Sequence, residues 1–141
     1  MNIVIDASVG IQWVVAETSS ARAIKLVDRP LIVPSLFYTE CANILWKKVV
    51  RGELTAATAC DCATLLGGVR IRIVPDVNLF VGALELACKL GHPAYDCLYL
   101  TLANSEKGIL VTADERLIER CRQAQVPWVK ETVRALNSFD S

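Results

Sequence analysis

Hydrophobic residues recur along this chain in two patterns. Short, nearly continuous runs rich in isoleucine, leucine and valine predict β-strands. They lie at 2–5, 31–33, 70–74 and 109–111, with a weaker one at 126–129. Longer segments with helical spacing predict helices. These segments are 8–15, 19–28, 36–51, 55–66, 77–90, 94–106 and 115–124. Strands and helices are therefore expected to alternate along the chain.

This alternation determines the expected architecture. Strands that are apolar along their whole length belong to a parallel sheet buried on both faces, with helices packed on each side. We therefore expect a three-layer α/β/α domain with a central parallel sheet of four to five strands. No repeat, low-complexity tract or linker interrupts the pattern, so residues 1–141 are interpreted as a single domain. In such sheets, ligands bind beyond the carboxyl ends of the strands.

Composition excludes several classes of protein. Fifteen basic and fifteen acidic residues give a formal charge of zero, so no overall field attracts nucleic acid or anionic lipid. The six cysteines lack the spacing of a disulfide framework, and we expect them to be reduced and buried. The first residues do not resemble a signal peptide, and the apolar run around 79–90 is too short to span a membrane. We expect a cytoplasmic protein without membrane attachment.

Two acidic residues follow predicted strands directly. Asp6 comes after the strand at 2–5, and Asp114 follows the strand at 109–111. Helix capping is the structural alternative for each, because aspartate is a common N-cap residue. Ser8 could cap the first helix equally well, and Thr112 with Glu115 fits the capping box S/T-x-x-E. We therefore expect Asp114 to be free for another role.

Two more acidic residues lie on largely apolar helices. Glu40 shares a helix face with Leu36 and Ile44, although a solvated position at the edge of that face is the alternative. Asp96 is the only charged residue in AYDCLYLTLANS, and it falls in the first turn after Pro93. The helix dipole favours a negative charge there, but a carboxylate in apolar surroundings also requires a partner.

Sheet topology can bring these four carboxylates together. Clustered carboxylates repel one another unless a cation enters, and hard oxygen ligands select Mg²⁺ or Mn²⁺. One ion or a pair can activate water against a phosphodiester, so metal-dependent phosphodiester hydrolysis is the expected reaction. An aspartyl-phosphate phosphatase would need a second aspartate where Ser8 stands. A receiver domain would need paired acids early in the chain and a late lysine, and this pattern is absent.

Four motifs, in order, resemble those of the PIN-domain ribonucleases, particularly the toxins of VapBC-type toxin-antitoxin pairs. They are VIDAS at 4–8, TECANIL at 39–45, AYDCLYLTLA at 94–103 and VTADERL at 111–117, and together they run across almost the whole chain. The resemblance implies a PIN-like fold and an endoribonuclease whose products carry a 5′-phosphate and a 3′-hydroxyl. It assigns one or two Mg²⁺ or Mn²⁺ ions to Asp6, Glu40, Asp96 and Asp114, with Ser8 and Thr112 as supporting hydroxyls.

The resemblance also implies protein partners. It predicts a homodimer with RNA crossing between the subunits, and a VapB-type antitoxin that covers the active site in a heterotetramer or larger complex. The helices at 36–51 and 55–66 form a candidate hairpin for docking the antitoxin. Leu45, Trp46 and Leu65 on these helices are either interface residues or core residues. A PIN-like RNA- or protein-binding module without turnover is the alternative function.

Residues that hold RNA are harder to find in the sequence. Lys47 and Arg51 continue the helical stripe of Glu40 and are candidates for phosphate binding, as is Arg116. Solvated surface charge is the alternative for all three. Asn43, one turn after Glu40, is a candidate for orienting that carboxylate. His92 is a candidate general base. The alternative is that it is a loop histidine that makes only a local hydrogen bond.

Overall fold

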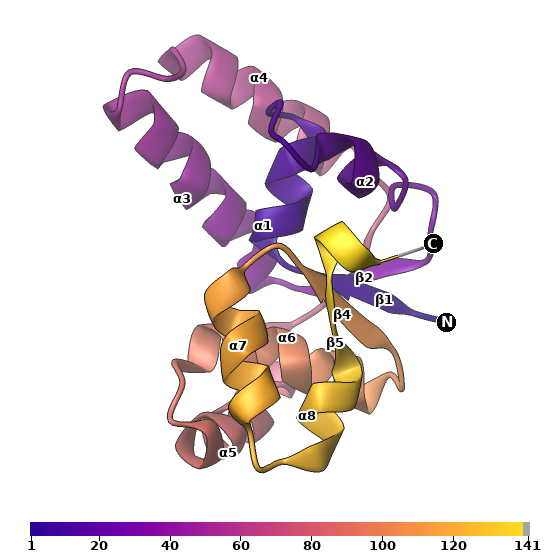
Figure 1. Cartoon of the computed structure of the whole chain (residues 1–141). Coiled ribbons are helices and arrows are strands. Elements are labelled where there is room, and N and C mark those ends of the chain that lie inside the picture. The colour runs from indigo at the N-terminus through magenta and orange to yellow at the C-terminus, as the bar shows by residue number, and fades with distance from the viewer. Residues whose placement is uncertain (140–141) are drawn as a thin grey trace.

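The computed structural model describes residues 1–139, and a five-stranded sheet lies at its centre (Figure 1). All neighbouring strands are parallel, in the order β3-β2-β1-β4-β5. The strands are β1 (Ile3–Ile5), β2 (Leu31–Pro34), β3 (Arg72–Val74), β4 (Ile109–Thr112) and β5 (Val133–Ala135). Ile3 pairs with Leu31 on one side and with Ile109 on the other. The carboxyl ends of the central strands therefore lie at one edge of the sheet.

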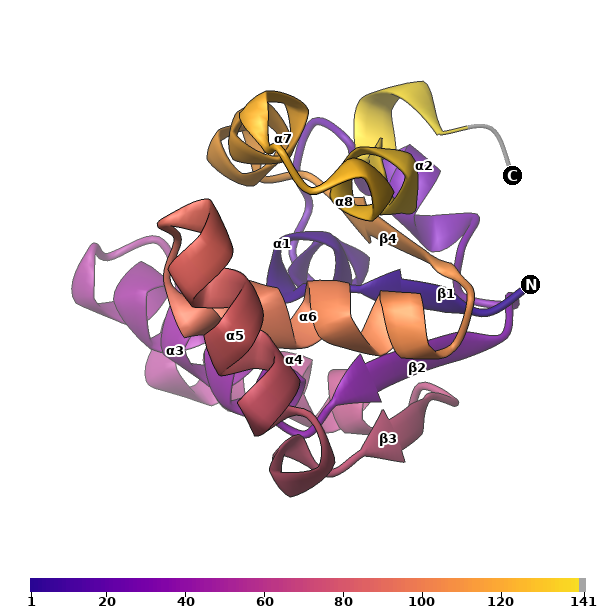
Figure 2. The same cartoon turned by 90° about the horizontal axis from the view of Figure 1, so that it is seen from below.

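Helices cover both faces of this sheet, which gives the expected three-layer α/β/α fold (Figures 1 and 2). One layer contains α5 (Phe80–Leu90), α6 (Ala94–Ser105), α7 (Glu115–Gln123) and α8 (Pro127–Thr132). The other contains α1 (Ala7–Gly10), α2 (Ser20–Ile24), α3 (Leu36–Val50) and α4 (Ala56–Gly67). The described part of the chain also contains three short 3₁₀ helices: η1 (Ile11–Trp13), η2 (Asp76–Asn78) and η3 (Leu136–Ser138). The antiparallel pair α3 and α4 extends away from the sheet (Figure 1).

One predicted strand is wrong. The segment 126–129 forms the start of α8, and the fifth strand lies further on, at Val133–Ala135. Pro127 occupies the first position of α8, where its fixed φ suits a helix and its missing N–H costs no hydrogen bond. Other boundaries also differ, because the helix predicted at 8–15 divides into α1 and η1 and the one at 19–28 shortens to α2.

The core follows from the sequence pattern. Every residue of β1 is fully buried, as are the apolar residues of β4 except Ile109, which is 7% exposed. Helix α6 contacts β1, β2 and β4 and buries six of its own residues.

All six cysteines are free, but Cys60 and Cys88 are exposed, which corrects the expectation that every cysteine is buried. Within residues 1–139, no helix is long and apolar enough to cross a membrane.

Gly10 allows α1 to pack tightly on α3. A Cβ atom at Gly10 would come within 2.5 Å of the Phe37 ring, and Phe37 is fully buried. The close approach of these helices holds the residues that follow β1 beside the first turns of α3. It therefore positions Asp6 and Glu40 beside the same pocket.

Candidate active site

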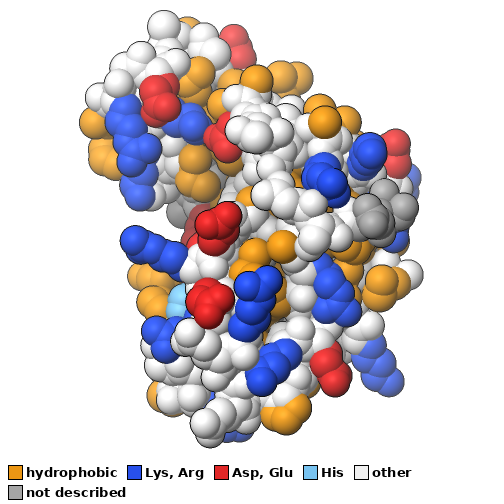
Figure 3. All heavy atoms as spheres, in the orientation of Figure 1, with side chains coloured by type: hydrophobic (Ala, Val, Ile, Leu, Met, Phe, Trp, Pro, Cys, Tyr) orange, Lys and Arg blue, Asp and Glu red, His pale blue; other side chains and the backbone are white. Residues whose placement is uncertain are grey.

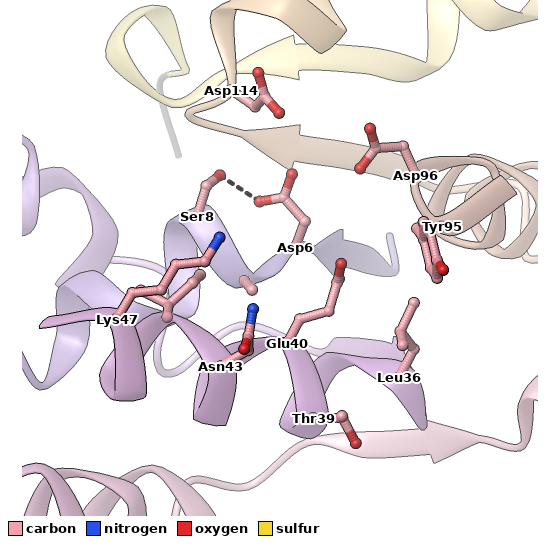
Figure 4. Close-up of a pocket in the computed structure, with 12 residues that line it drawn as sticks. Asp6, Ser8, Leu36, Thr39, Glu40, Asn43, Lys47, Tyr95, Asp96 and Asp114 are labelled. Atoms are coloured by element: carbon pink, nitrogen blue, oxygen red, sulfur yellow. Dashed lines mark hydrogen bonds between the residues drawn. The ribbon is translucent and has the colours of Figure 1, made fainter. Parts of the chain in front are cut away.

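The four predicted acidic residues line a single pocket at the carboxyl edge of the sheet (Figure 4). Asp6 follows β1, Glu40 comes from α3, Asp96 from α6, and Asp114 from the end of the loop after β4. Their side chains point toward a common space in the close-up. In the space-filling view, the surface is hollowed between the α3 and α4 hairpin and the lobe of α5 to α7, and charged side chains border the hollow (Figure 3).

Asp6 is the most deeply buried of the four carboxylates, with 5% of its surface exposed. It occupies the N-cap position of α1, but its side chain makes no capping hydrogen bond. Instead, Ser8 Oγ donates to Oδ1 at 2.5 Å and Thr112 Oγ1 donates to Oδ2 at 2.5 Å. The capping alternative for Asp6 is therefore wrong, and both predicted supporting hydroxyls contact this carboxylate.

Burial is the main influence on the ionisation of Asp6. Loss of solvent raises the pKa of its carboxyl to about 7, against the lowering effect of the Ser8 and Thr112 hydrogen bonds. The negative charges of Asp96 and Asp114 raise this pKa further. The carboxylates are therefore close enough to repel one another, as expected for a cluster that a cation would stabilise.

Glu40 is half-buried and points into the pocket (Figure 4). Its Oε1 accepts a hydrogen bond from the hydroxyl of Tyr99, which is fully buried in α6. Burial raises the pKa of the Glu40 carboxyl, the Tyr99 hydrogen bond lowers it, and Asp96 raises it. The solvated-edge alternative for Glu40 therefore does not describe its environment.

Asp96 lies in the first turn of α6, as predicted, and is half-buried. Its hydrogen-bond partner is His92, which was not predicted from the sequence as its partner and whose Nε2 lies 2.6 Å from Asp96 Oδ2. His92 precedes α6 by two residues and is a loop histidine with a local hydrogen bond, which is the second of the two roles considered for it. The spacing of four residues between these side chains is a signal that the sequence already contained.

Asp114 caps α7, which corrects the expectation that it is free of this role. Its Oδ1 accepts hydrogen bonds from the backbone N–H groups of Arg116 at 3.0 Å and Leu117 at 3.2 Å. The predicted capping box does not form because Thr112 is the last residue of β4 and directs its hydroxyl to Asp6. Asp114 nevertheless lines the pocket, so its side chain serves both the helix and the acidic cluster.

The donor set fits a hard divalent cation. Within residues 1–139, no lysine or arginine forms an ion pair with any of the four carboxylates, and only Asp96 has a basic neighbour, His92. In the same part of the chain, no three acidic, histidine or cysteine side chains are close enough to enclose an ion. The carboxylates therefore share one pocket in an open arrangement.

The remaining predicted residues are distributed over two pockets. Asn43 and Lys47 line the acidic pocket and are exposed. A second pocket contains Arg51 together with Lys48, and it shares Ser8, Ile44 and Lys47 with the first. The two pockets are therefore neighbours on the surface. Arg116 is exposed and lines neither of them.

The helical hairpin presents part of its apolar surface to solvent. Leu45 is 3% exposed and belongs to the core, whereas Trp46 is 60% exposed and Leu65 is 66% exposed. Val50, on the same helix as Trp46, is also exposed. The core interpretation is therefore correct for Leu45 and wrong for the other two predicted residues.

Comparisons with known proteins agree with this fold. The PIN domain profile matches residues 3–123. Ribonuclease VapC3 of Pyrobaculum aerophilum is 32% identical over 124 residues, which cover 85% of this chain and 95% of that protein. A crystal structure of a protein from P. aerophilum superposes with a TM-score of 0.71 at 21% identity, covering 98% of this chain and 85% of that one. A chain in a toxin-antitoxin complex from Klebsiella pneumoniae superposes with a TM-score of 0.63 at 11% identity, covering 95% of this chain and 97% of that one. This chain therefore belongs to the PIN-domain family, together with the VapC ribonucleases.

Proposed function

We propose that this protein is a metal-dependent endoribonuclease and the toxin of a type II toxin-antitoxin pair. The observation that carries the proposal is the convergence of four carboxylates on one pocket, with Asp6 buried at its base and without a basic partner among residues 1–139. Membership of the family that contains the VapC ribonucleases supports RNA as the substrate.

The protein's part in the reaction follows from the geometry. Asp6, Glu40, Asp96 and Asp114 would hold one or two Mg²⁺ or Mn²⁺ ions, which would supply Lewis-acid stabilisation of the phosphodiester and a lowered pKa for the attacking water. Ser8 and Thr112 fix both oxygens of Asp6 and so keep its orientation constant. This preorganisation leaves the more exposed carboxylates to adjust when substrate and ion enter.

The second pocket supports a path for the RNA strand. It shares Ser8 and Lys47 with the acidic pocket, and it contains Lys48 and Arg51. We propose that the scissile phosphate lies at the carboxylates and that Lys47 and Arg51 bind neighbouring phosphates. Asn43 lines the acidic pocket and would contact the RNA or the carboxylate of Glu40. Arg116, outside both pockets, would contact RNA further from the cleavage site.

An antitoxin and a second subunit are the proposed protein partners. The structural likeness to a chain from a toxin-antitoxin complex supports a VapB-type antitoxin. The exposed apolar side chains of Trp46 and Leu65 on the hairpin offer a docking surface for it. We also propose a homodimer, which would form a heterotetramer or larger complex with the antitoxin.

A cleavage assay tests the proposed activity. The purified protein is incubated with RNA in Mg²⁺, in Mn²⁺ and in EDTA, next to the variant Asp6→Asn. We expect fragments with 5′-phosphates only with the parent and only with metal. If the parent binds RNA but does not cut it with either metal, the alternative of a binding module without turnover is correct. If Asp6→Asn cuts as fast as the parent, the acidic pocket is not the active site.

A further inference from the structure

Tyr99 joins two elements of the acidic pocket although it belongs to the core. Its side chain is fully buried in α6, and its hydroxyl reaches across to Glu40 in α3. Tyr99 follows Asp96 by three residues, so both project from the same face of α6. One helix face therefore supplies a carboxylate to the pocket and a hydrogen-bond donor to the carboxylate opposite.

The acidic side chains share a pattern of hydrogen bonding. Among the described residues, Glu40 accepts a hydrogen bond on Oε1, Asp96 pairs through Oδ2, and Asp114 accepts on Oδ1. The second oxygen of each of these carboxylates has no protein donor in residues 1–139. Only Asp6 is held on both oxygens. Three carboxylates are thus fixed on one oxygen and keep the other available.

The Tyr99 hydroxyl is well suited to hold one oxygen of Glu40. A buried hydroxyl without a partner is costly, so this one remains on Glu40 whether or not an ion is bound. Tyr99 provides a neutral donor, which fixes the orientation of Glu40 without cancelling its charge. A lysine in the same place would neutralise the carboxylate and compete with a cation.

We propose that Tyr99 is a positioning residue that holds Glu40 Oε1, so that Oε2 is presented to the divalent cation. The inference rests on the proposed metal site and assigns Tyr99 no contact with the ion or the RNA. Loss of a hydrogen-bonding partner of a metal ligand typically lowers metal affinity 10–100-fold, and about this loss is expected when the hydroxyl is removed.

Calorimetric titration of RNA-free protein with Mn²⁺ tests the proposal without a cleavage assay. We expect Tyr99→Phe to bind Mn²⁺ about 10–100-fold more weakly than the parent. Tyr38→Phe is the matched control, because Tyr38 is a half-buried tyrosine of α3 that packs edge-to-face against Phe37 and does not line the pocket. Its Mn²⁺ affinity should equal that of the parent. Circular dichroism compares the folding of all three proteins.

A double-mutant cycle shows whether Tyr99 acts through Glu40. Glu40→Gln should lower Mn²⁺ affinity by itself, and adding Tyr99→Phe should then cause little further loss. Equal affinity of Tyr99→Phe and the parent would overturn the inference, as would an undiminished loss in the Glu40→Gln background. A parent that does not bind Mn²⁺ would instead overturn the proposed metal site itself.

A measurement on the parent keeps the test independent of the folding of the Tyr99 variant. The chain has three tyrosines, so ¹³C labelling at Cζ gives three signals. Tyr38→Phe and Tyr95→Phe assign two of them and leave the third to Tyr99. Titration with diamagnetic Mg²⁺ should shift the Tyr99 signal, because the charge on its acceptor changes. A Tyr99 signal that does not move while the protein binds Mg²⁺ would contradict the inference.

Discussion

The hydroxyl of Thr112 donates a hydrogen bond of 2.5 Å to the carboxylate of Asp6, although 106 positions separate them in the chain. The contact exists because β1 and β4 are parallel neighbours, with Ile5 paired to Val111, so that the residues after Ile5 and Val111 lie side by side. Each of the two strands thus delivers one partner to the base of the acidic pocket. Thr112 is fully buried, so the contact is shielded from water.

Removal of this hydroxyl should destabilise the protein. Thr112→Val preserves the shape of the side chain but takes one donor from a buried carboxylate, which costs about 1–3 kcal/mol of unfolding free energy. Urea unfolding at pH 8 in EDTA measures the change. Thr132→Val is the control, since Thr132 is similarly buried but donates to the backbone oxygen of Trp128. A loss for Thr112→Val no larger than that of the control would contradict the expected role.

The metal-free protein should lose stability as the pH rises. Burial disfavours the charged form of Asp6 and raises its pKa from 3.8, the value for an exposed aspartate as in the unfolded chain, to about 7 in the folded protein. Between these values the folded state holds a proton that the unfolded state has released, so the unfolding free energy falls with increasing pH. The full loss, complete above pH 7, is on the order of 4 kcal/mol.

Asp6→Asn should abolish most of this pH dependence. Urea unfolding of the parent and the variant in EDTA, from pH 4 to pH 8, measures the difference between them. The variant is expected to be the more stable protein at pH 8, because it places no charge in the buried position. Mg²⁺ should raise the stability of the parent at pH 8 and leave the variant unchanged. Parallel pH profiles for the two proteins would show that Asp6 does not carry the effect.

Two substitutions at Asp114 separate its capping role from its place in the acidic pocket. Asparagine is as good an N-cap as aspartate, so Asp114→Asn should keep the stability of the metal-free protein. Asp114→Ala removes the cap and should cost about 1 kcal/mol. Both should weaken Mn²⁺ binding in a calorimetric titration, because neither side chain carries the charge. If Asp114→Asn bound Mn²⁺ like the parent, Asp114 would act only as a cap.

Lys47 should contribute to RNA affinity through a phosphate contact. In the Asp6→Asn background, which prevents cleavage, Lys47→Ala is expected to weaken RNA binding. It should also reduce the slope of log K against log salt concentration by about 0.7, the value for one phosphate contact on a single strand. Lys130→Ala is the control, because Lys130 is exposed in α8, a helix that lines neither pocket. Equal slopes for the two lysine variants would contradict the proposed RNA path.

The sequence predicted the sheet where the pattern was strong. The sequence was sufficient to predict β1, β2 and β4 from their apolar runs, because a strand buried on both faces is apolar along its length. It was also sufficient to predict α3 and α6 from their helical spacing. At 126–129, valine, proline and tryptophan suggested a strand, but Pro127 begins a helix. The strand that follows has the sequence VRA, in which Arg134 interrupts any apolar run, so the pattern that revealed the other strands is absent there.

The acidic residues and the supporting hydroxyls of Ser8 and Thr112 were also predicted from the sequence, but the pairing of each carboxylate with its hydrogen-bond partner was not. Thr112 looked like the start of a capping box because its true acceptor, Asp6, is distant in the chain. The hydrogen bond between Tyr99 and Glu40 could not be predicted for the same reason, because 59 positions separate the two residues in the chain. Such contacts depend on strand order, which local patterns do not contain. The His92 and Asp96 pair is different, because its spacing of four residues was visible beforehand.

We propose that Asp6, Glu40, Asp96 and Asp114 together hold a divalent cation. Anomalous diffraction at the manganese edge, from crystals grown with Mn²⁺ and without RNA, tests it most directly. We expect a peak within bonding distance of oxygens from Asp6 and Asp96, with Glu40 and Asp114 drawn toward it directly or through water. A manganese peak elsewhere on the molecule, or no peak in this pocket at saturating Mn²⁺, would show that the four carboxylates do not form the metal site.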